Sequence, residues 1–183
     1  MMRLLRVECQ SQRGFTLLEL LVVLVLIGIV ASLATLSLGN GAERLLRSES
    51  ERLAGVLRLA RDELLITGGA DRALGLRRDA YSLLELVILD DASREWQPLL
   101  DPQLGPRQLE EGLLEISFQQ NGNRRPLPLP LPQTGGWEPH VHLSNTGEMT
   151  PGLIILRVPR QNLERHIEIG LEGRVEVLDA QPR

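Results

Sequence analysis

An uncharged apolar run near the N-terminus constrains the fold of this chain more than any other feature. No charged residue occurs from Leu20 to Leu38, a stretch of 19 residues in a chain of 183. As a helix, a stretch of that length matches the hydrocarbon thickness of a bilayer. Residues 1–14 carry three Arg against one Glu, and such a basic leader stays on the cytoplasmic side of a membrane. The run therefore predicts one membrane-spanning helix, with the rest of the chain on the outer side.

A cleaved secretory signal is the alternative interpretation of the same run. Ser32-Leu33-Ala34 would supply its small-x-small cleavage site. Two features oppose it: the run is longer than a usual signal core, and the ionisable Glu19 lies at its beginning. A carboxylate at that depth costs about 2–3 kcal/mol of insertion free energy unless it finds a partner. Glu19 therefore predicts a cationic partner within the membrane.

The residues around Glu19 form a specific motif. The segment from Arg13 to Val23, RGFTLLELLVV, resembles the processing site of type IV pilins and type II secretion pseudopilins. The resemblance implies that a prepilin peptidase cuts between Gly14 and Phe15 and methylates the new amine of Phe15. It also implies that Glu19 pairs with that amine on a neighbouring subunit. Electrostatics supports this pairing, because the free amine is cationic near neutral pH. A cation and a carboxylate inside the membrane offset the free-energy cost of their desolvation mainly by forming an ion pair.

Removal of the leader changes the composition of the chain. It takes three of the 20 basic residues, all Arg, and one of the 24 acidic residues, which leaves 17 against 23. It also takes Cys9, the one cysteine of the sequence, so a disulfide in the mature chain is excluded. The acidic balance disfavours binding to nucleic acid.

A second helical pattern follows the apolar run. Gly39-Asn40-Gly41 is a weak point, because glycine in a helix interior costs about 1 kcal/mol relative to alanine. Beyond it the periodicity predicts an amphipathic helix that stops at Thr67-Gly68-Gly69, with Arg58 and Asp62 placed to pair. A coiled-coil dimer is the alternative use of its apolar seam. That seam comprises Leu46, Leu53, Leu57, Ala60 and Leu64.

The remainder of the chain is typical of β structure. Asn121-Gly122, Thr146-Gly147 and Glu172-Gly173 are turn pairs. The proline-rich segment from Arg125 to Pro132 is excluded from a central strand, and it predicts an extended loop or a sheet edge. The fold class is therefore α+β, with a long N-terminal helix packed by its apolar face on one side of an antiparallel sheet. The expected strands are Tyr81 to Leu89, Leu113 to Phe118, His140 to Leu143, Leu153 to Val158, His166 to Ile169 and Arg174 to Leu178.

Within the pilin superfamily the head resembles the minor pseudopilin H (GspH) family of type II secretion. The resemblance rests on Leu74 to Arg77 followed by Tyr81, on Trp96 to Leu99, and on Leu143 to Pro151 before an apolar strand. It implies a type IV pilin-like fold in four parts: a cleaved leader (1–14), a transmembrane helix (15–38), its amphipathic continuation (39–67) and a periplasmic β-rich head (68–183).

Candidate chemical sites in the head are few. His140 and His142 alternate in an expected strand and share one face, but two His without a third ligand are more often ordinary surface residues. Asp90-Asp91 and Asp101 are better interpreted as turn residues than as a calcium loop. The sequence has no catalytic constellation and no phosphate-binding glycine loop. We therefore expect a non-enzyme with no catalytic residue, no cofactor and no metal.

The expected function is that of a minor pseudopilin in an inner membrane. The resemblance implies that it links a tip complex of other minor pseudopilins to the major pseudopilin during export of folded proteins. Its further partners would be the prepilin peptidase, the inner-membrane assembly platform and membrane lipid. The alternative is a minor type IV pilin for DNA uptake or adhesion, although Arg77-Arg78 and Arg124-Arg125 are only pairs of basic residues. A membrane-anchored hydrolase is a third class, which the lack of a site disfavours.

Overall fold

The computed structural model describes residues 17–90, 92–110, 112–128 and 136–179, without the side chains of residues 30–40. Helix α1 (Leu17–Thr67) is 51 residues long, and ten strands follow it within these described residues. The chain divides into two compact units, Met1–Asn40 and Gly41–Arg183. The division therefore falls within the glycine pair that the sequence marks as a weak point. Among the described residues, no helical stretch combines the length and the apolar character needed to cross a membrane.

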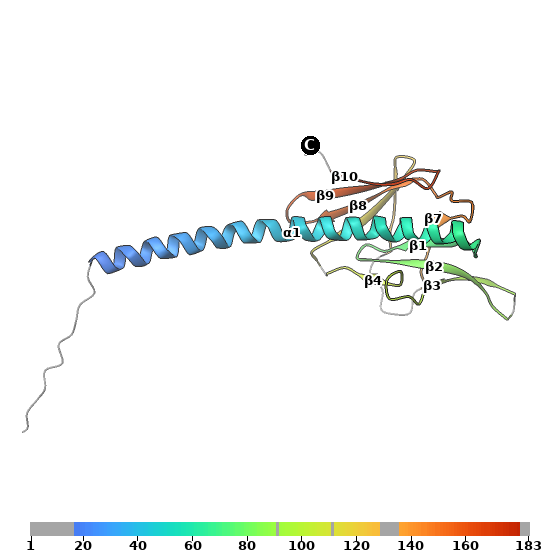
Figure 1. Cartoon of the computed structure of the whole chain (residues 1–183), viewed down its shortest axis with the longest axis horizontal. Coiled ribbons are helices and arrows are strands. Elements are labelled where there is room, and N and C mark those ends of the chain that lie inside the picture. Colours follow the sequence, from blue (N-terminus) through green and yellow to red (C-terminus); the bar gives the residue numbers. More distant parts are fainter. Residues whose placement is uncertain (1–16, 91, 111, 129–135, 180–183) are drawn as a thin grey trace, which may run out of the picture. The chain divides into compact units, whose positions relative to one another are not determined.

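The strands of the second unit form two antiparallel sheets of five strands each (Figure 1). The expectation of a single sheet under the helix was therefore wrong, although the α+β class is confirmed. One sheet has the order β3 (Arg94–Pro98), β2 (Ala80–Ile88), β1 (Arg72–Leu76), β7 (Pro139–Leu143), with β4 (Arg107–Gln108) also paired to β2. The other has the order β10 (Val175–Asp179), β9 (Leu163–Ile169), β8 (Gly152–Val158), β5 (Glu115–Gln120), β6 (Asn123–Arg125).

The six expected strands correspond to β2, β5, β7, β8, β9 and β10. The other four, β1, β3, β4 and β6, were not predicted. They are two to five residues long, and too short or too polar to show an alternating pattern. Asn121-Gly122 forms the β5–β6 turn, with φ angles of +51° and +75°, and Gly173 lies in the β9–β10 turn with φ +74°. The proline-rich segment begins where edge strand β6 ends at Arg125, and its residues 129–132 lie outside the described part.

One hydrophobic core joins the helix to both sheets. Leu57 of α1, Leu83 of β2 and Ile167 of β9 are completely buried in it. The predicted seam of α1 faces this core, and each of its residues is at most 2% exposed. The coiled-coil alternative was wrong, because the head of the same chain already covers that seam. Burial of such side chains contributes about 1.5–3 kcal/mol each.

Helix α1 ends at Thr67, directly before a glycine in the left-handed conformation. Gly68 adopts φ +60°, and its N–H donates to the carbonyl of Leu64 at 2.9 Å. This left-handed residue satisfies a carbonyl that the last helical turn leaves open. The predicted stop at Thr67-Gly68-Gly69 is confirmed.

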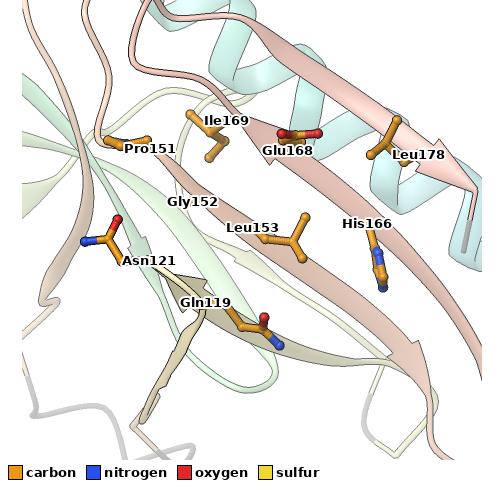
Figure 2. Close-up of a pocket in the computed structure, with 10 residues that line it drawn as sticks. Gln119, Asn121, Pro151, Gly152, Leu153, His166, Glu168, Ile169 and Leu178 are labelled. Atoms are coloured by element: carbon orange, nitrogen blue, oxygen red, sulfur yellow. The ribbon is translucent and has the colours of Figure 1, made fainter.

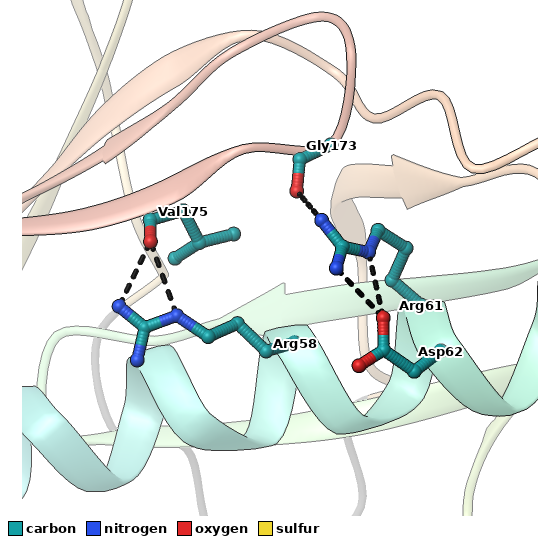
Figure 3. Close-up of polar contacts among 5 residues, drawn as sticks. All are labelled: Arg58, Arg61, Asp62, Gly173 and Val175. Atoms are coloured by element: carbon teal, nitrogen blue, oxygen red, sulfur yellow. Dashed lines mark hydrogen bonds and ion pairs between the residues drawn. The ribbon is translucent and has the colours of Figure 1, made fainter.

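Two arginines of α1 bind the β9–β10 region through backbone carbonyls (Figure 3). Arg58 donates from Nε and Nη2 to the carbonyl of Val175 at 3.1 and 2.8 Å. Arg61 donates to the carbonyl of Gly173 at 2.5 Å and also pairs with Asp62. The predicted Arg58–Asp62 pair was wrong. Strand β10 is an edge strand, and its carbonyls lack a second strand to satisfy them.

We expect that replacing Gly173 with alanine destabilises the head by more than about 2 kcal/mol. A left-handed φ costs alanine about 1–2 kcal/mol, and a Cβ at Gly173 would also collide with the carbonyl oxygen of Gly147 and with Cδ of Arg61. Gly122 is the matched control, because its φ is +75° but a Cβ there meets nothing within 4 Å. Urea unfolding of fragment 41–183 measures both losses. Equal losses in Gly173→Ala and Gly122→Ala would contradict the collision.

Candidate functional site

The predicted processing site lies outside the described residues, since these begin at residue 17. Gly14 and Phe15, the residues on either side of the proposed cleavage, therefore lie outside the described part of the chain. Glu19 is described, and it lies exposed in the first turn of α1. A carboxylate at that position interacts favourably with the positive end of the helix dipole.

The helix surface around Glu19 is apolar on every side. Every large apolar side chain from Leu17 to Ile29 is between 41% and 82% exposed, with the extremes at Val23 and Leu17. A helix that is apolar all round is stable only when lipid or other helices cover it. The first unit therefore carries an extended surface for burial in an apolar environment, with one acid near its beginning.

The head contains an open groove of about 500 Å³ on the outer side of the sheet that contains β8 and β9 (Figure 2). Leu153 of β8 lies on its floor, and Gln119, His166 and Glu168 project from the neighbouring strands. These lining residues include no serine, threonine or cysteine nucleophile for the histidine to activate. The titratable side chains of this groove are therefore one histidine and one carboxylate, His166 and Glu168.

The predicted aspartates have structural surroundings. Asp101 Oδ1 accepts the backbone N–H groups of Gln103 and Leu104 at 2.7 and 2.9 Å, which makes it a turn residue as predicted. Asp90 follows β2, and Asp91 lies outside the described residues. In the described part of the chain, no three His, Cys, Asp or Glu side chains gather closely enough to hold a metal ion.

His140 and His142 each contact an aromatic ring. His142 meets Trp96 edge-on, with ring centroids 5.5 Å apart, and His140 meets Phe118 at 6.3 Å. Nδ1 of His140 lies 2.9 Å from the carbonyl of Glu138 and 3.2 Å from the backbone nitrogen of Leu76. The first contact needs a hydrogen on Nδ1 and the second needs a lone pair there, so the two contacts belong to different tautomers or charge states of the His140 ring.

Comparison with known proteins decides the family. Type II secretion system protein H of Pseudomonas aeruginosa is 34% identical over 182 residues, which cover 92% of this chain and 98% of that protein. This chain belongs to the type II secretion system protein H family. A second protein H, from Aeromonas hydrophila, is 36% identical over 107 residues, 56% of this chain and 55% of its own. Residues 9–35 match the model of the prokaryotic N-terminal methylation motif.

Solved structures agree on the fold of this chain. The crystal structure of the minor pseudopilin EpsH from the type II secretion system of Vibrio cholerae superimposes with a TM-score of 0.59 at 16% identity. It covers 76% of this chain and 97% of its own. The solution structure of Escherichia coli GspH gives a TM-score of 0.55 at 17% identity, over 76% and 91% of the two chains. The resemblance to minor pseudopilin H and the pilin-like α+β fold are confirmed, and the comparisons do not favour the type IV pilus alternative.

The surroundings of His140 bear on the pH dependence of the stability of the head. Burial lowers the pKa of His140, and the hydrogen bond to the Glu138 carbonyl opposes that shift. The unfolded chain, with an ordinary histidine pKa near 6.5, therefore binds the proton more readily than the folded chain. The contribution of neutral His140 to the free energy of unfolding is complete above about pH 6.5. It is lost as the pH falls through the pKa of His140 in the folded chain, which is lower.

We expect the free energy of unfolding of the head to fall between about pH 7.5 and pH 5, and to fall less in His140→Gln. Urea unfolding of fragment 41–183 at both pH values measures the difference. His142→Gln is the matched control, because His142 lies two residues along the same strand and is exposed. If His140→Gln and His142→Gln keep the same pH dependence as the unchanged fragment, burial of His140 does not couple folding to pH.

Proposed function

We propose that this protein is a minor pseudopilin that acts as a structural, non-catalytic subunit of the pseudopilus. It links a tip complex of other minor pseudopilins to the major pseudopilin during export of folded proteins. The observation that carries this proposal is the apolar helix surface from Leu17 to Ile29, exposed all round and bearing Glu19, in a chain of the protein H family. Such a surface is suited to packing among membrane helices. Its side chains are exposed and do not belong to the core of the head.

The proposed processing follows from the motif at the N-terminus. A prepilin peptidase cuts between Gly14 and Phe15, removes the leader 1–14, and methylates the amine of Phe15. The match to the methylation motif over residues 9–35 supports this assignment. Residues 15–38 then anchor the protein in the inner membrane, residues 39–67 continue the helix, and residues 68–183 form the head in the periplasm.

Four kinds of partner follow from the proposed role. Other minor pseudopilins and the major pseudopilin contact the helix and the head, and the assembly platform in the inner membrane receives the mature chain. The prepilin peptidase acts earlier, on the leader. Membership of a type II secretion family supports assembly within a pseudopilus, and the individual partners are part of the proposal.

A secretion assay tests the proposed function. In a strain that lacks its own protein H, expression of this chain is expected to restore export of a reporter exoprotein. Crosslinking in the same membranes is expected to join the mature chain to the major pseudopilin. Restored DNA uptake or adhesion without restored export would instead support a type IV pilus.

Duplex DNA separates the two functions in vitro. We expect fragment 41–183 to bind duplex DNA weakly or not at all, because the chain is acidic and its arginines are interspersed with carboxylates. Any residual binding should fall steeply as salt is raised. Sub-micromolar affinity at physiological salt would contradict the secretion assignment and favour an uptake pilus.

A further inference from the structure

The structure gathers into one groove four arginines that come from separate parts of the sequence. Arg78, Arg124, Arg125 and Arg157 line an open groove of about 520 Å³, together with Glu115. The two arginine pairs of the sequence thus contribute to a single basic surface. Arg157, which is 32 residues from Arg125, is the second-last residue of the predicted strand from Leu153 to Val158 and has no sequence signal that links it to either pair.

Backbone contacts between the two sheets create this surface. The N–H of Ile116 in β5 donates to the carbonyl of Arg78, which follows β1, at 2.7 Å, and the N–H of Arg78 donates to the carbonyl of Pro128 at 3.3 Å. Strand register places Arg124 beside Gln119, and Arg157 beside Glu115. The arginines are therefore fixed by three separate segments of a folded head.

The charges in the groove are only partly balanced. Arg157 pairs with Glu115 at 2.9 Å, and Arg125 donates to the side-chain carbonyl of Gln120 at 3.1 and 2.9 Å. Arg78 and Arg124 are exposed, and neither forms an ion pair with a described residue. The adjoining segment 126–136 has no acidic residue that could neutralise them.

We propose that this groove binds an acidic segment of a neighbouring protein subunit, through carboxylate side chains that meet Arg78 and Arg124. The guanidinium fork binds carboxylates through two parallel hydrogen bonds. A protein segment can place individual carboxylates beside the two open arginines, whereas the acidic balance of the whole chain opposes the continuous phosphates of a nucleic acid. This inference rests on the proposed role of the chain as an assembly subunit.

A peptide-binding experiment on the full chain in detergent tests the groove. The probe is a fluorescent oligoglutamate peptide, and an oligoglutamine peptide of the same length reports binding without charge. The double variant Arg78→Gln/Arg124→Gln is expected to bind oligoglutamate about tenfold more weakly than the unchanged chain. The double variant Arg94→Gln/Arg160→Gln removes the same charge from exposed arginines outside the groove, and it is expected to bind as the unchanged chain does.

Each other outcome overturns the inference. Equal weakening in both double variants would mean that only the net charge matters, and equal binding of oligoglutamine would mean that carboxylates are not recognised. Tighter binding of duplex DNA than of oligoglutamate, lost in Arg78→Gln/Arg124→Gln, would assign the groove to nucleic acid. Thermal unfolding checks that both variants are folded. The peptide assay needs no pseudopilus, so failure of the groove and failure of the secretion assay are separate results.

Discussion

The variant Gly14→Val is expected to remain in the inner membrane as an uncut precursor. In the proposed mechanism the peptidase holds the residue before Phe15 in a narrow cleft, where a Cβ obstructs access to the scissile bond. Glycine is the residue that allows close approach of a backbone. The expected effect is almost complete loss of the mature form, and Gly14→Ala should act in the same direction.

Mass spectrometry of the isolated protein measures this effect. The unchanged chain should begin at Phe15 with a methylated amine, and the Gly14→Val variant should keep residues 1–14. Gly28→Ala is the matched control, because it changes a glycine within the apolar part of α1 where a Cβ meets nothing within 4 Å. Processing of that control should be normal. A mature chain that begins at Thr35, just after Ala34, would instead establish the signal-peptide alternative.

The variant Glu19→Ala is expected to be cut and inserted normally but to fail at assembly. Removing the carboxylate makes the isolated segment more soluble in lipid, so insertion should not suffer. If its partner is the amine of Phe15 on the next subunit, the neighbour's cation is left buried without compensation. Removing one member of a buried ion pair costs roughly 3–5 kcal/mol, which lowers incorporation by on the order of a hundredfold or more.

Crosslinking to the other pseudopilins and secretion of a reporter exoprotein measure the loss. Both should fall to background in Glu19→Ala and in Glu19→Gln, because the glutamine keeps the shape but not the charge. Leu18→Ala removes an exposed apolar side chain from the same turn, and it should retain most of both signals. Normal crosslinking and secretion in Glu19→Ala would show that Glu19 is only a tolerated acid at the membrane edge.

Local pattern in the sequence is enough to predict several features of this protein. The apolar seam from Leu46 to Leu64 repeats with the helical period, and this period alone identifies the face that the head buries. Glycine at position 68 sets the end of α1, because its backbone conformation is open to few other residues. The segment around Gly14, Phe15 and Glu19 indicates the N-terminal methylation motif, since its residues are contiguous. The six longer strands are also visible as apolar or alternating runs.

Which distant segments meet depends on the tertiary fold. Arg58 could have paired with Asp62 one helical turn away, but folding brings the carbonyl of edge-strand residue Val175 to it. The short strands β1, β3, β4 and β6 exist because neighbouring strands supply their hydrogen bonds, which two to five residues cannot signal alone. In the same way, a contact between β5 and Arg78 creates the arginine groove. Local pattern determines which face of an element is apolar, whereas long polar side chains take their partners from whatever backbone or charge the fold brings near.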